Sequence, residues 1–396
     1  MWHKHTDKVI DRKLPSKVII GDGKVHKLVQ QLYLKQNCTK QGMRKHMESD
    51  DMFQEIVPLN ARNGLASGNR KISTRWNNII RQAFNKATLT QAQDNKEGEY
   101  HKLYQKKDQN SAEYRKSKDN FQCLISKQMV GVFISAWVRS DIHQHIRHPS
   151  VSCVGCGIMG CLGNKGSVSV RFCLHETSFC FVCSHLASGG KEGDEIHRNT
   201  DATEILSQTR FPQGPLRNLP QKILNHDRVI WLGNLNYRIY LPEATTRSLV
   251  HKKEWNALLE NDQLKAKFMK GHVFEGWKER VIEFAPTYKY YPNSGIYHGW
   301  GCRQKKKGKK RRAPAWCDRI IWFGEEGLKQ IECYRAESGL SDHRPIREIF
   351  TAEIEVLSDA KEESVVALIA VMLERDPLAF STPLMPIRRF STASNT

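Results

Sequence analysis

The sequence lacks any long apolar run. No stretch of about 18 or more apolar residues, the length that a membrane-spanning helix needs, occurs in its 396 residues. The longest candidate, residues 365–373, is about half that length. The opening Met-Trp-His-Lys-His is polar and basic, unlike the apolar centre of a signal peptide. These absences predict a cytoplasmic protein, with the nucleus or the periphery of a membrane as further locations.

Acidic residues are scarce relative to basic ones. Lys and Arg total 62 against 42 Asp and Glu, which gives a formal net charge of +20. Such an excess favours polyanionic partners: nucleic acid, an anionic membrane or a multiply phosphorylated small molecule. General solubility with a few basic loops is the alternative explanation, and charge alone does not choose among these.

The cysteines are odd in number, at 11, and no secretory signal accompanies them, which indicates reduced thiols. Cys153 and Cys156, like Cys180 and Cys183, have the spacing of a zinc site. However, residues 179–186 read as an apolar strand, and residues three apart on a strand point to opposite faces. We therefore favour ordinary buried cysteines over a metal site.

The chain divides by composition into a basic, weakly patterned segment at 1–50, one domain at 51–357 and a tail at 358–396 that we expect to be disordered. Within the domain, residues 62–120 read as a disordered insertion, with a short helix at 76–84.

Short apolar segments predict strands, and two longer segments have helical spacing. The strands are expected at 127–138, 167–173, 179–183, 228–232, 282–284, 319–322 and 350–356, and the helices at 194–209 and 245–260. Several strands follow one another directly, which predicts a mixed-sheet α/β sandwich rather than a doubly wound parallel fold.

Polar side chains crowd the ends of these strands, where open α/β proteins bind ligands. Glu55 is a hard oxygen ligand suited to Mg²⁺. Asn236 can orient a phosphate or a water without adding negative charge. His185 and His343 can donate hydrogen bonds to charge that develops on phosphoryl oxygens, and Asp342 could orient a nearby imidazole. These residue types suit phosphoester hydrolysis.

Seven short motifs together resemble those of the inositol polyphosphate 5-phosphatases, and residues 53–61 and 184–206 are most similar to the plant type I branch. The pairing of Pro-Ala-Trp-Cys-Asp-Arg with a separate Ser-Asp-His-Arg-Pro is the most specific part. The motifs are Gln-Glu at 54–55, Gly-Asn-Lys-Gly at 163–166, Ser-His-Leu-Ala-Ser-Gly at 184–189, the segment 231–238, Pro-Thr-Tyr-Lys-Tyr at 286–290, the segment 312–319 and Ser-Asp-His-Arg-Pro at 341–345.

The resemblance implies a DNase-I-like, four-layered α/β sandwich with two packed mixed sheets. It also implies Mg²⁺-dependent removal of the 5-phosphate from inositol polyphosphates or phosphoinositide headgroups, with transient contact with anionic membranes. By resemblance Glu55 would bind the metal, and Asn236 and His185 would engage the scissile phosphate. His343 would act with a paired acid, either Asp318 or Asp342.

The resemblance further matches Tyr288, Lys289 and Arg312 to a clamp for a second ring phosphate, the 4-phosphate. A cation and a hydroxyl can grip such a phosphate. A DNA backbone needs no such clamp, so nucleic acid is the disfavoured partner. The same motifs assign three more residues to substrate binding: Asn164, Lys165 and Arg319.

Position 234 departs from the family pattern. Asn234 stands where the family has the aspartate that activates the attacking water, and an amide cannot accept that proton. Two hypotheses follow: an enzyme with weakened turnover, or a pseudophosphatase that binds phosphoinositides or protein partners.

The amino-terminal part departs as well, because residues 1–52 contain no match to the Asn-ending strand that opens the family domain. This predicts a sandwich without its N-terminal strand pair and with an unpaired sheet edge. A truncated gene model, a splice form or a degenerate enzyme would each explain it.

A basic run from Arg303 to Arg312 directly precedes the Arg-Ala-Pro motif. Attraction of the substrate or of an anionic membrane, nuclear targeting, and a merely solvated loop are three readings of it.

Overall fold

The computed structural model describes part of the chain. Its backbone alone is described at 26–37 and 367–373. Side chains are described for residues 73–82, 84, 121–157, 163–213, 219–291, 293–300, 312–324, 326–337 and 341–356.

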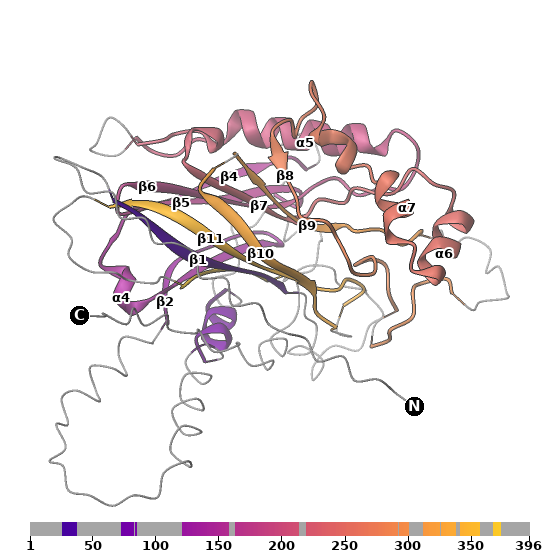
Figure 1. Ribbon diagram of the computed structural model, residues 1–396, viewed down its shortest axis with the longest axis horizontal. Helices are drawn as coiled ribbons and strands as arrows, with labels where there is room; N and C mark the ends of the chain where they lie inside the picture. The colour runs from indigo at the N-terminus through magenta and orange to yellow at the C-terminus, as the bar shows by residue number, and fades with distance from the viewer. Residues whose placement is uncertain are drawn as a thin grey trace, which may run out of the picture.

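Two six-stranded sheets form the centre of the molecule and lie one above the other (Figure 1). In each sheet one neighbouring pair is parallel, β1 with β12 and β6 with β7, and the other pairs are antiparallel. The first sheet has the order β10 (Leu328–Arg335), β11 (Ile346–Val356), β1 (His26–Asn37), β12 (Ala367–Leu373), β3 (Val132–Arg139) and β2 (Phe121–Met129). The second has the order β4 (Ile146–Gly155), β5 (Gly166–Leu174), β6 (Thr177–His185), β7 (Arg228–Asn234), β9 (Asp318–Phe323) and β8 (Trp277–Lys278).

Helices cover the outer faces of both sheets. The α5 helix (Asp194–Gln208) lies across the second sheet (Figure 1), with Asp194 and Glu195 in its first turn, where the helix dipole favours negative charge. On the first sheet, the helical residues 73–82 pack against β2 and β3, where the Asn77 amide donates to the Ser126 hydroxyl at 2.9 Å. Helix, sheet, sheet and helix make four layers, as the resemblance implied. The shorter helices are α4 (Ser140–His143), η2 (Ile223–Asn225), α6 (Glu243–Lys252), α7 (Trp255–Glu260) and η3 (Lys265–Phe268).

The period-two alternation of the strands divides the core into two clusters. On β6, Phe179, Phe181 and Cys183 face the first sheet, whereas Cys180 and Val182 face the helix-covered side. The predicted divergence of Cys180 and Cys183 is thereby confirmed, and both side chains are buried.

Three predicted elements differ from the structure. The expected strand at 127–138 is instead parts of β2 and β3, because the chain turns at Val130, whose φ of 50° is left-handed. The expected strand at 282–284 is absent, and the two-residue strand β8 (Trp277–Lys278) is the last strand before that segment. The expected helix at 245–260 is two helices, because Lys253 takes a left-handed conformation (φ 60°) and ends α6.

The two ends of the chain contribute strands that the sequence patterns did not predict. β1 lies inside the first sheet, paired with β11 on one side and β12 on the other. The expected loss of an N-terminal strand pair is therefore corrected by the strand β1, and the expectation of disorder at 367–373 is corrected by β12. Both errors have one cause: periodicity in a short segment does not reveal pairing partners distant in sequence.

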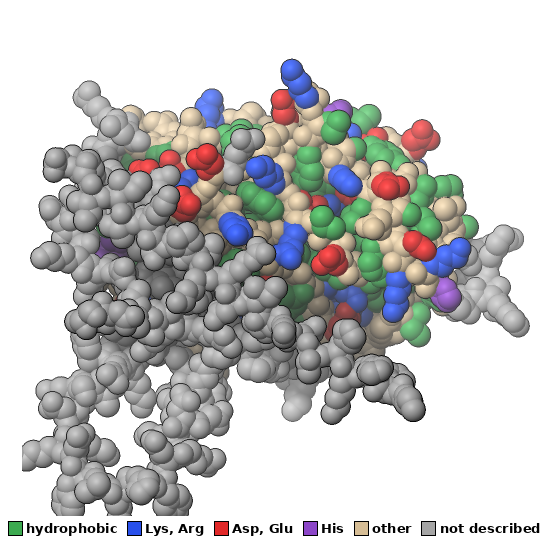
Figure 2. Space-filling model, in the orientation of Figure 1, with side chains coloured by type: hydrophobic (Ala, Val, Ile, Leu, Met, Phe, Trp, Pro, Cys, Tyr) green, Lys and Arg blue, Asp and Glu red, His purple; other side chains and the backbone are tan. Residues whose placement is uncertain are grey.

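Basic and acidic side chains alternate over the face shown in Figure 2, where the described Lys and Arg do not gather into one patch. Within the described residues, no helix has the length and apolar character needed to cross a membrane.

Candidate active site

Three polar residues form one row across the second sheet. His185 is the last residue of β6 and Asn234 is the last of β7, and the parallel register pairs them directly. Asp318 is the first residue of β9 and pairs with Asn234 in the antiparallel register. Strand pairing therefore brings His185 and Asp318 into one row, although they lie 133 positions apart in the sequence.

All three belong to the face of the sheet that looks toward the first sheet. Each of the three lies two positions along its strand from an apolar residue of the core between the sheets, and residues two apart on a strand share a face. These apolar residues are Cys183, Leu232 and Ile320. The row thus lies at one end of the space between the two sheets, where the apolar core gives way to polar groups.

Gly233 allows β6 and β7 to approach closely beside this row. Its φ is 139°, and a Cβ atom there would lie 2.1 Å from the Ser184 carbonyl oxygen. No other residue fits this position without moving the backbone, so Gly233 sets the spacing of Asn234 from His185.

His343 joins the row from the other sheet. It lies just before β11, and its Nδ1 donates to Asp318 Oδ2 at 2.8 Å in a buried pair. The carboxylate fixes the proton on Nδ1 and orients the ring. The structure thus selects Asp318, and not Asp342, as the acid beside His343.

The His185 ring receives two donors at Nε2. Lys165 Nζ lies 2.5 Å away and Asn234 Nδ2 lies 3.5 Å away. Asn234 is 3% exposed, and its Oδ1 has no hydrogen-bond partner among the described residues. A buried acceptor without a partner is costly, so this oxygen marks a place for a bound water or ligand.

Asn236 and Tyr288 are linked by Arg238, which the sequence interpretation did not select as a site residue. Asn236 Nδ2 donates to the Leu186 carbonyl at 3.0 Å, and its Oδ1 accepts from Arg238 Nη2 at 2.8 Å. The Arg238 guanidinium lies 4.5 Å from the centroid of the Tyr288 ring, which in turn packs on His343 at 4.6 Å. Arg238 falls inside the motif at 231–238, and its place next to polar strand ends was the available signal.

The residues of the expected phosphate clamp lie along the same rim. Lys289 Nζ forms an ion pair with Asp342 Oδ2 at 2.8 Å. The acid next to His343 in the sequence therefore pairs with Lys289. Arg312 lies beside Gly190 of the loop after β6, and Arg247 holds its carbonyl at 2.9 Å. These contacts place Tyr288, Lys289 and Arg312 near the His185–His343 end of the sandwich.

Arg319 does not lie in the site, contrary to the expectation from its motif. It alternates with Asp318 on β9 and therefore points to the opposite, helix-covered face. There its guanidinium bonds both Asp262 oxygens at 2.9 Å and also pairs with Glu279, with no side-chain exposure. Burial raises the pKa of Glu279, and Arg319 opposes that rise. The role of Arg319 is to neutralise two buried acids.

Asp201 of α5 supports the loop that follows His185. Its Oδ2 accepts from the Ala187 backbone N–H at 2.7 Å. Burial raises the pKa of Asp201 to about 6, against the opposing effects of the Ala187 N–H and of Lys165. Asp201 thus ties α5 to the site through a carboxyl group that is costly to ionise.

The expected metal ligand Glu55 lies outside the described residues, and so does most of the basic run that ends at Arg312. Among the residues that are described, no group of three or more His, Cys, Asp or Glu could hold a metal ion. Asn234 Oδ1 and the half-buried Asn164, whose Oδ1 also has no hydrogen-bond partner in the described structure, are the neutral oxygens on offer. Magnesium needs few protein carboxylates because it keeps waters and binds substrate phosphate, so this donor set fits it if Glu55 completes the site.

Comparison with known proteins defines the class first. Residues 25–349 match the endonuclease/exonuclease/phosphatase family 2 model. A solved inositol polyphosphate 5-phosphatase domain, that of SPsynaptojanin in complex with inositol (1,4)-bisphosphate and calcium ion, superposes with a TM-score of 0.62. The sequences are 26% identical, and the match covers 85% of this chain and 88% of that one.

Two Arabidopsis thaliana proteins narrow the class. Type IV inositol polyphosphate 5-phosphatase 9 is 58% identical over 310 residues, which cover 78% of this chain and 71% of the relative. Type I inositol polyphosphate 5-phosphatase 8 is 44% identical over 322 residues, which cover 79% of this chain and 65% of the relative, slightly less than two thirds of its length. The chain therefore belongs to the inositol polyphosphate 5-phosphatases, a family of phosphoric monoester hydrolases.

Proposed function

We propose that this protein hydrolyses the 5-phosphate of inositol polyphosphates or phosphoinositide headgroups with Mg²⁺, at a rate lowered by Asn234. One observation carries this function: the row of His185, Asn234 and Asp318 meets the His343–Asp318 pair at a single end of the sandwich. Family membership supports the chemistry, and the inositol (1,4)-bisphosphate bound by the SPsynaptojanin domain supports the substrate class.

His343 and Lys165 would stabilise the charge of the reacting phosphoryl group. Asp318 holds the His343 imidazole in one orientation and stabilises its protonated form. Lys165 brings a positive charge to His185, the other imidazole of the candidate site. Phosphoryl transfer depends mainly on such positioned charges and donors, so this arrangement suits it.

Asn234 would position the attacking water without deprotonating it. Its Oδ1, which has no hydrogen-bond partner in the described part of the chain, can accept a hydrogen bond from a water but cannot keep the proton. Loss of a general base typically lowers the rate about 10²- to 10⁴-fold. We therefore expect slow turnover, with the remaining electrostatic stabilisation intact.

A bound Mg²⁺ would supply Lewis-acid polarisation of the phosphate oxygens. Glu55, with Asn234 or Asn164 as neighbouring oxygen donors, would hold it. The calcium ion in the SPsynaptojanin complex supports a divalent cation in this family.

Tyr288, Lys289 and Arg312 would recognise a second phosphate on the ring. Lys289 is held by Asp342, and Arg312 lies next to the loop after His185. Substrates with a phosphate adjacent to the 5-position would then bind more tightly than those without it.

The test is Mg²⁺-dependent phosphate release from inositol 1,4,5-trisphosphate and from its phosphoinositide counterpart. Native protein, Asn234→Asp and His343→Ala are compared, and His272→Ala, which changes an exposed histidine, is the matched control. We expect slow release by the native protein, a gain of about 10²-fold or more in Asn234→Asp, and loss in His343→Ala.

If neither the native protein nor Asn234→Asp releases phosphate from any inositol substrate, the proposed catalytic function is refuted. Headgroup binding without turnover would then identify the pseudophosphatase that Asn234 also suggests. Release by the native protein that His343→Ala leaves unchanged would refute the assignment of His343.

A location in the cytoplasm with transient docking on anionic membranes accords with this substrate class. Neutralising the lysines between Arg303 and Arg312 should then weaken sedimentation with anionic liposomes. Unchanged sedimentation would reject a role of this run in docking.

A further inference from the structure

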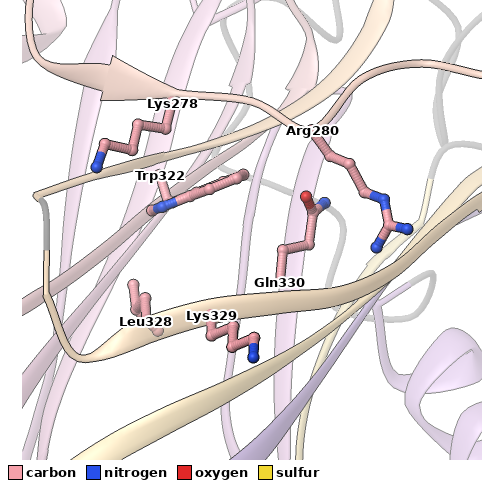
Figure 3. Close-up of a pocket in the computed structure, with 6 residues that line it drawn as sticks. All are labelled: Lys278, Arg280, Trp322, Leu328, Lys329 and Gln330. Atoms are coloured by element: carbon pink, nitrogen blue, oxygen red, sulfur yellow. The ribbon is translucent and has the colours of Figure 1, made fainter. Parts of the chain in front are cut away.

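A cationic pocket opens between the edges of the two sheets. It has a volume of about 370 Å³ and lies between β8 and β9 of the second sheet and β10 of the first (Figure 3). Its lining residues are Lys278, Arg280, Trp322, Leu328, Lys329 and Gln330.

This pocket is separate from the candidate active site. Trp322 lies four positions beyond Asp318 on β9, a distance of about 13 Å at the usual rise of a strand. No residue of the row, and none of the expected clamp, lines it.

Positive charge without an opposing acid characterises the lining. Lys278 and Arg280 come from the segment at β8, and Lys329 comes from β10 (Figure 3). The intervening Glu279 points inward to Arg319. The Lys329 side chain leaves β10 on the side opposite to Gln330 (Figure 3), so the charge of the pocket comes from Lys278 and Arg280. Two such cations attract an anion.

The wall of the pocket is partly apolar and is connected to both sheets. The Trp322 ring packs edge-on against Phe350 of the first sheet, with ring centroids 5.4 Å apart. At β10, the register shifts between Gln330 and Glu332, and the Arg280 guanidinium donates to the carbonyl of the intervening Ile331. This contact ties the segment after β8 to the other sheet and fixes one cation at the mouth.

The Gln330 side-chain amide, which also lines the pocket, has unused hydrogen-bonding capacity. Both polar atoms of the Gln330 side chain are shielded from solvent and make no well-aligned hydrogen bond, although the amide lies against the buried Glu348 carboxyl. Burial raises the pKa of this Glu348 carboxyl well above its usual range. The Gln330 amide is therefore a donor beside the two cations, an arrangement suited to a phosphate oxygen.

We propose that this pocket binds a phosphate group of an anionic ligand, independently of the candidate active site. Lys278 and Arg280 hold the charge, and the Gln330 amide donates to an oxygen. The ligand is either a soluble phosphate compound or a phosphorylated lipid headgroup, because both present the same group.

The experiment measures binding of inorganic pyrophosphate to the full chain by calorimetry. The double variant Lys278→Gln/Arg280→Gln removes the cations of the pocket, and Lys165→Gln removes one from the active site. Lys127→Gln is the matched control, because Lys127 is an exposed lysine on β2, the opposite edge of the first sheet from β10.

We expect the double variant to bind pyrophosphate at the pocket at least about tenfold more weakly, while Lys127→Gln binds as the native protein does. Lys165→Gln should retain the pocket binding. Phosphate release from inositol 1,4,5-trisphosphate should be the same in the double variant and the native protein, which separates this site from catalysis.

A second arm measures sedimentation with phosphatidylcholine vesicles that contain phosphatidylinositol 4-phosphate. If the double variant loses vesicle binding together with pyrophosphate binding, the phosphate is that of a lipid, and if it loses only pyrophosphate binding, the ligand is soluble. If it loses neither, or if only Lys165→Gln reduces binding, the pocket is not an anion site.

Discussion

At the scale of single residues, the proposed slow turnover depends on position 234, where the resemblance predicts a carboxylate and this chain has an amide that cannot act as a base. Asn234 keeps the position in the row, between His185 and Asp318, that strand pairing gives it. Its donor atom faces His185 and its acceptor has no partner in the described structure. On the proposed function, the geometry for binding a phosphate would therefore be separable from the capacity to activate water.

The two aspartates beside His343 should respond differently to the same substitution. Asp318→Asn should lower kcat by about 10²-fold or more, because His343 loses the carboxylate that orients it. Asp342→Asn should mainly raise KM, because it frees Lys289 from its partner.

Steady-state kinetics with inositol 1,4,5-trisphosphate, in the Asn234→Asp background if the native rate is too low, distinguish the two effects. A larger loss of kcat in Asp342→Asn than in Asp318→Asn would contradict the pairing.

At the scale of elements, the alternation of side chains along a strand decides which of two consecutive residues faces the candidate site. Asp318 and Arg319 are adjacent in one motif, yet β9 sends the first to the site and the second to a buried pair with Asp262 and Glu279. On α5, Asp201 reaches across to the loop after β6 and accepts from the Ala187 N–H. These contacts hold the strand ends on which the site depends.

The α5 contact should make stability depend on pH through Asp201. Its pKa of about 6 in the folded protein lies above the ordinary value of 3.8, so the folded state binds this proton more tightly than the unfolded state. The native free energy of unfolding should therefore fall, relative to that of Asp201→Asn, as the pH rises from 4 to about 6.5, by at most about 3 kcal/mol.

Urea unfolding of both proteins across this pH range measures the difference. A difference that stays constant would show that Asp201 does not titrate in the window. A relative gain in native stability with rising pH would mean that the Ala187 N–H and Lys165 outweigh burial.

At the scale of the whole molecule, segments from both ends of the chain complete the first sheet. β1 joins β11 to β12, and β12 joins β1 to β3, so the four strands form a continuous ladder only when residues 26–37 and 367–373 take part. His343 directly precedes β11 of this sheet and His185 ends β6 of the other, so the arrangement of the candidate site depends on this continuous ladder.

Leu32→Pro should destabilise the protein through the backbone of β1. Leu32 pairs with Phe350 on one side and Leu368 on the other, so a proline there removes an internal ladder hydrogen bond. We expect a free energy of unfolding about 1–3 kcal/mol lower than that of Leu32→Ala, which controls for the lost side chain. Equal stability of the two variants in urea would contradict the internal position of β1.

The sequence by itself determined the family, the sandwich and most strands of the second sheet, because contiguous apolar runs and short motifs are local patterns. It also determined that His185, Asn234 and His343 lie near strand ends, whereas Asp318 was selected only through its motif. Each of these conclusions follows from neighbours along the chain.

Tertiary structure decided what depends on partners distant in sequence. It paired His343 with Asp318, turned Arg319 away from the site, added Arg238 beside Tyr288, and placed strands at residues 26–37 and 367–373. The physical reason is that side-chain direction and strand pairing are set by register between segments up to hundreds of residues apart, which no local pattern records.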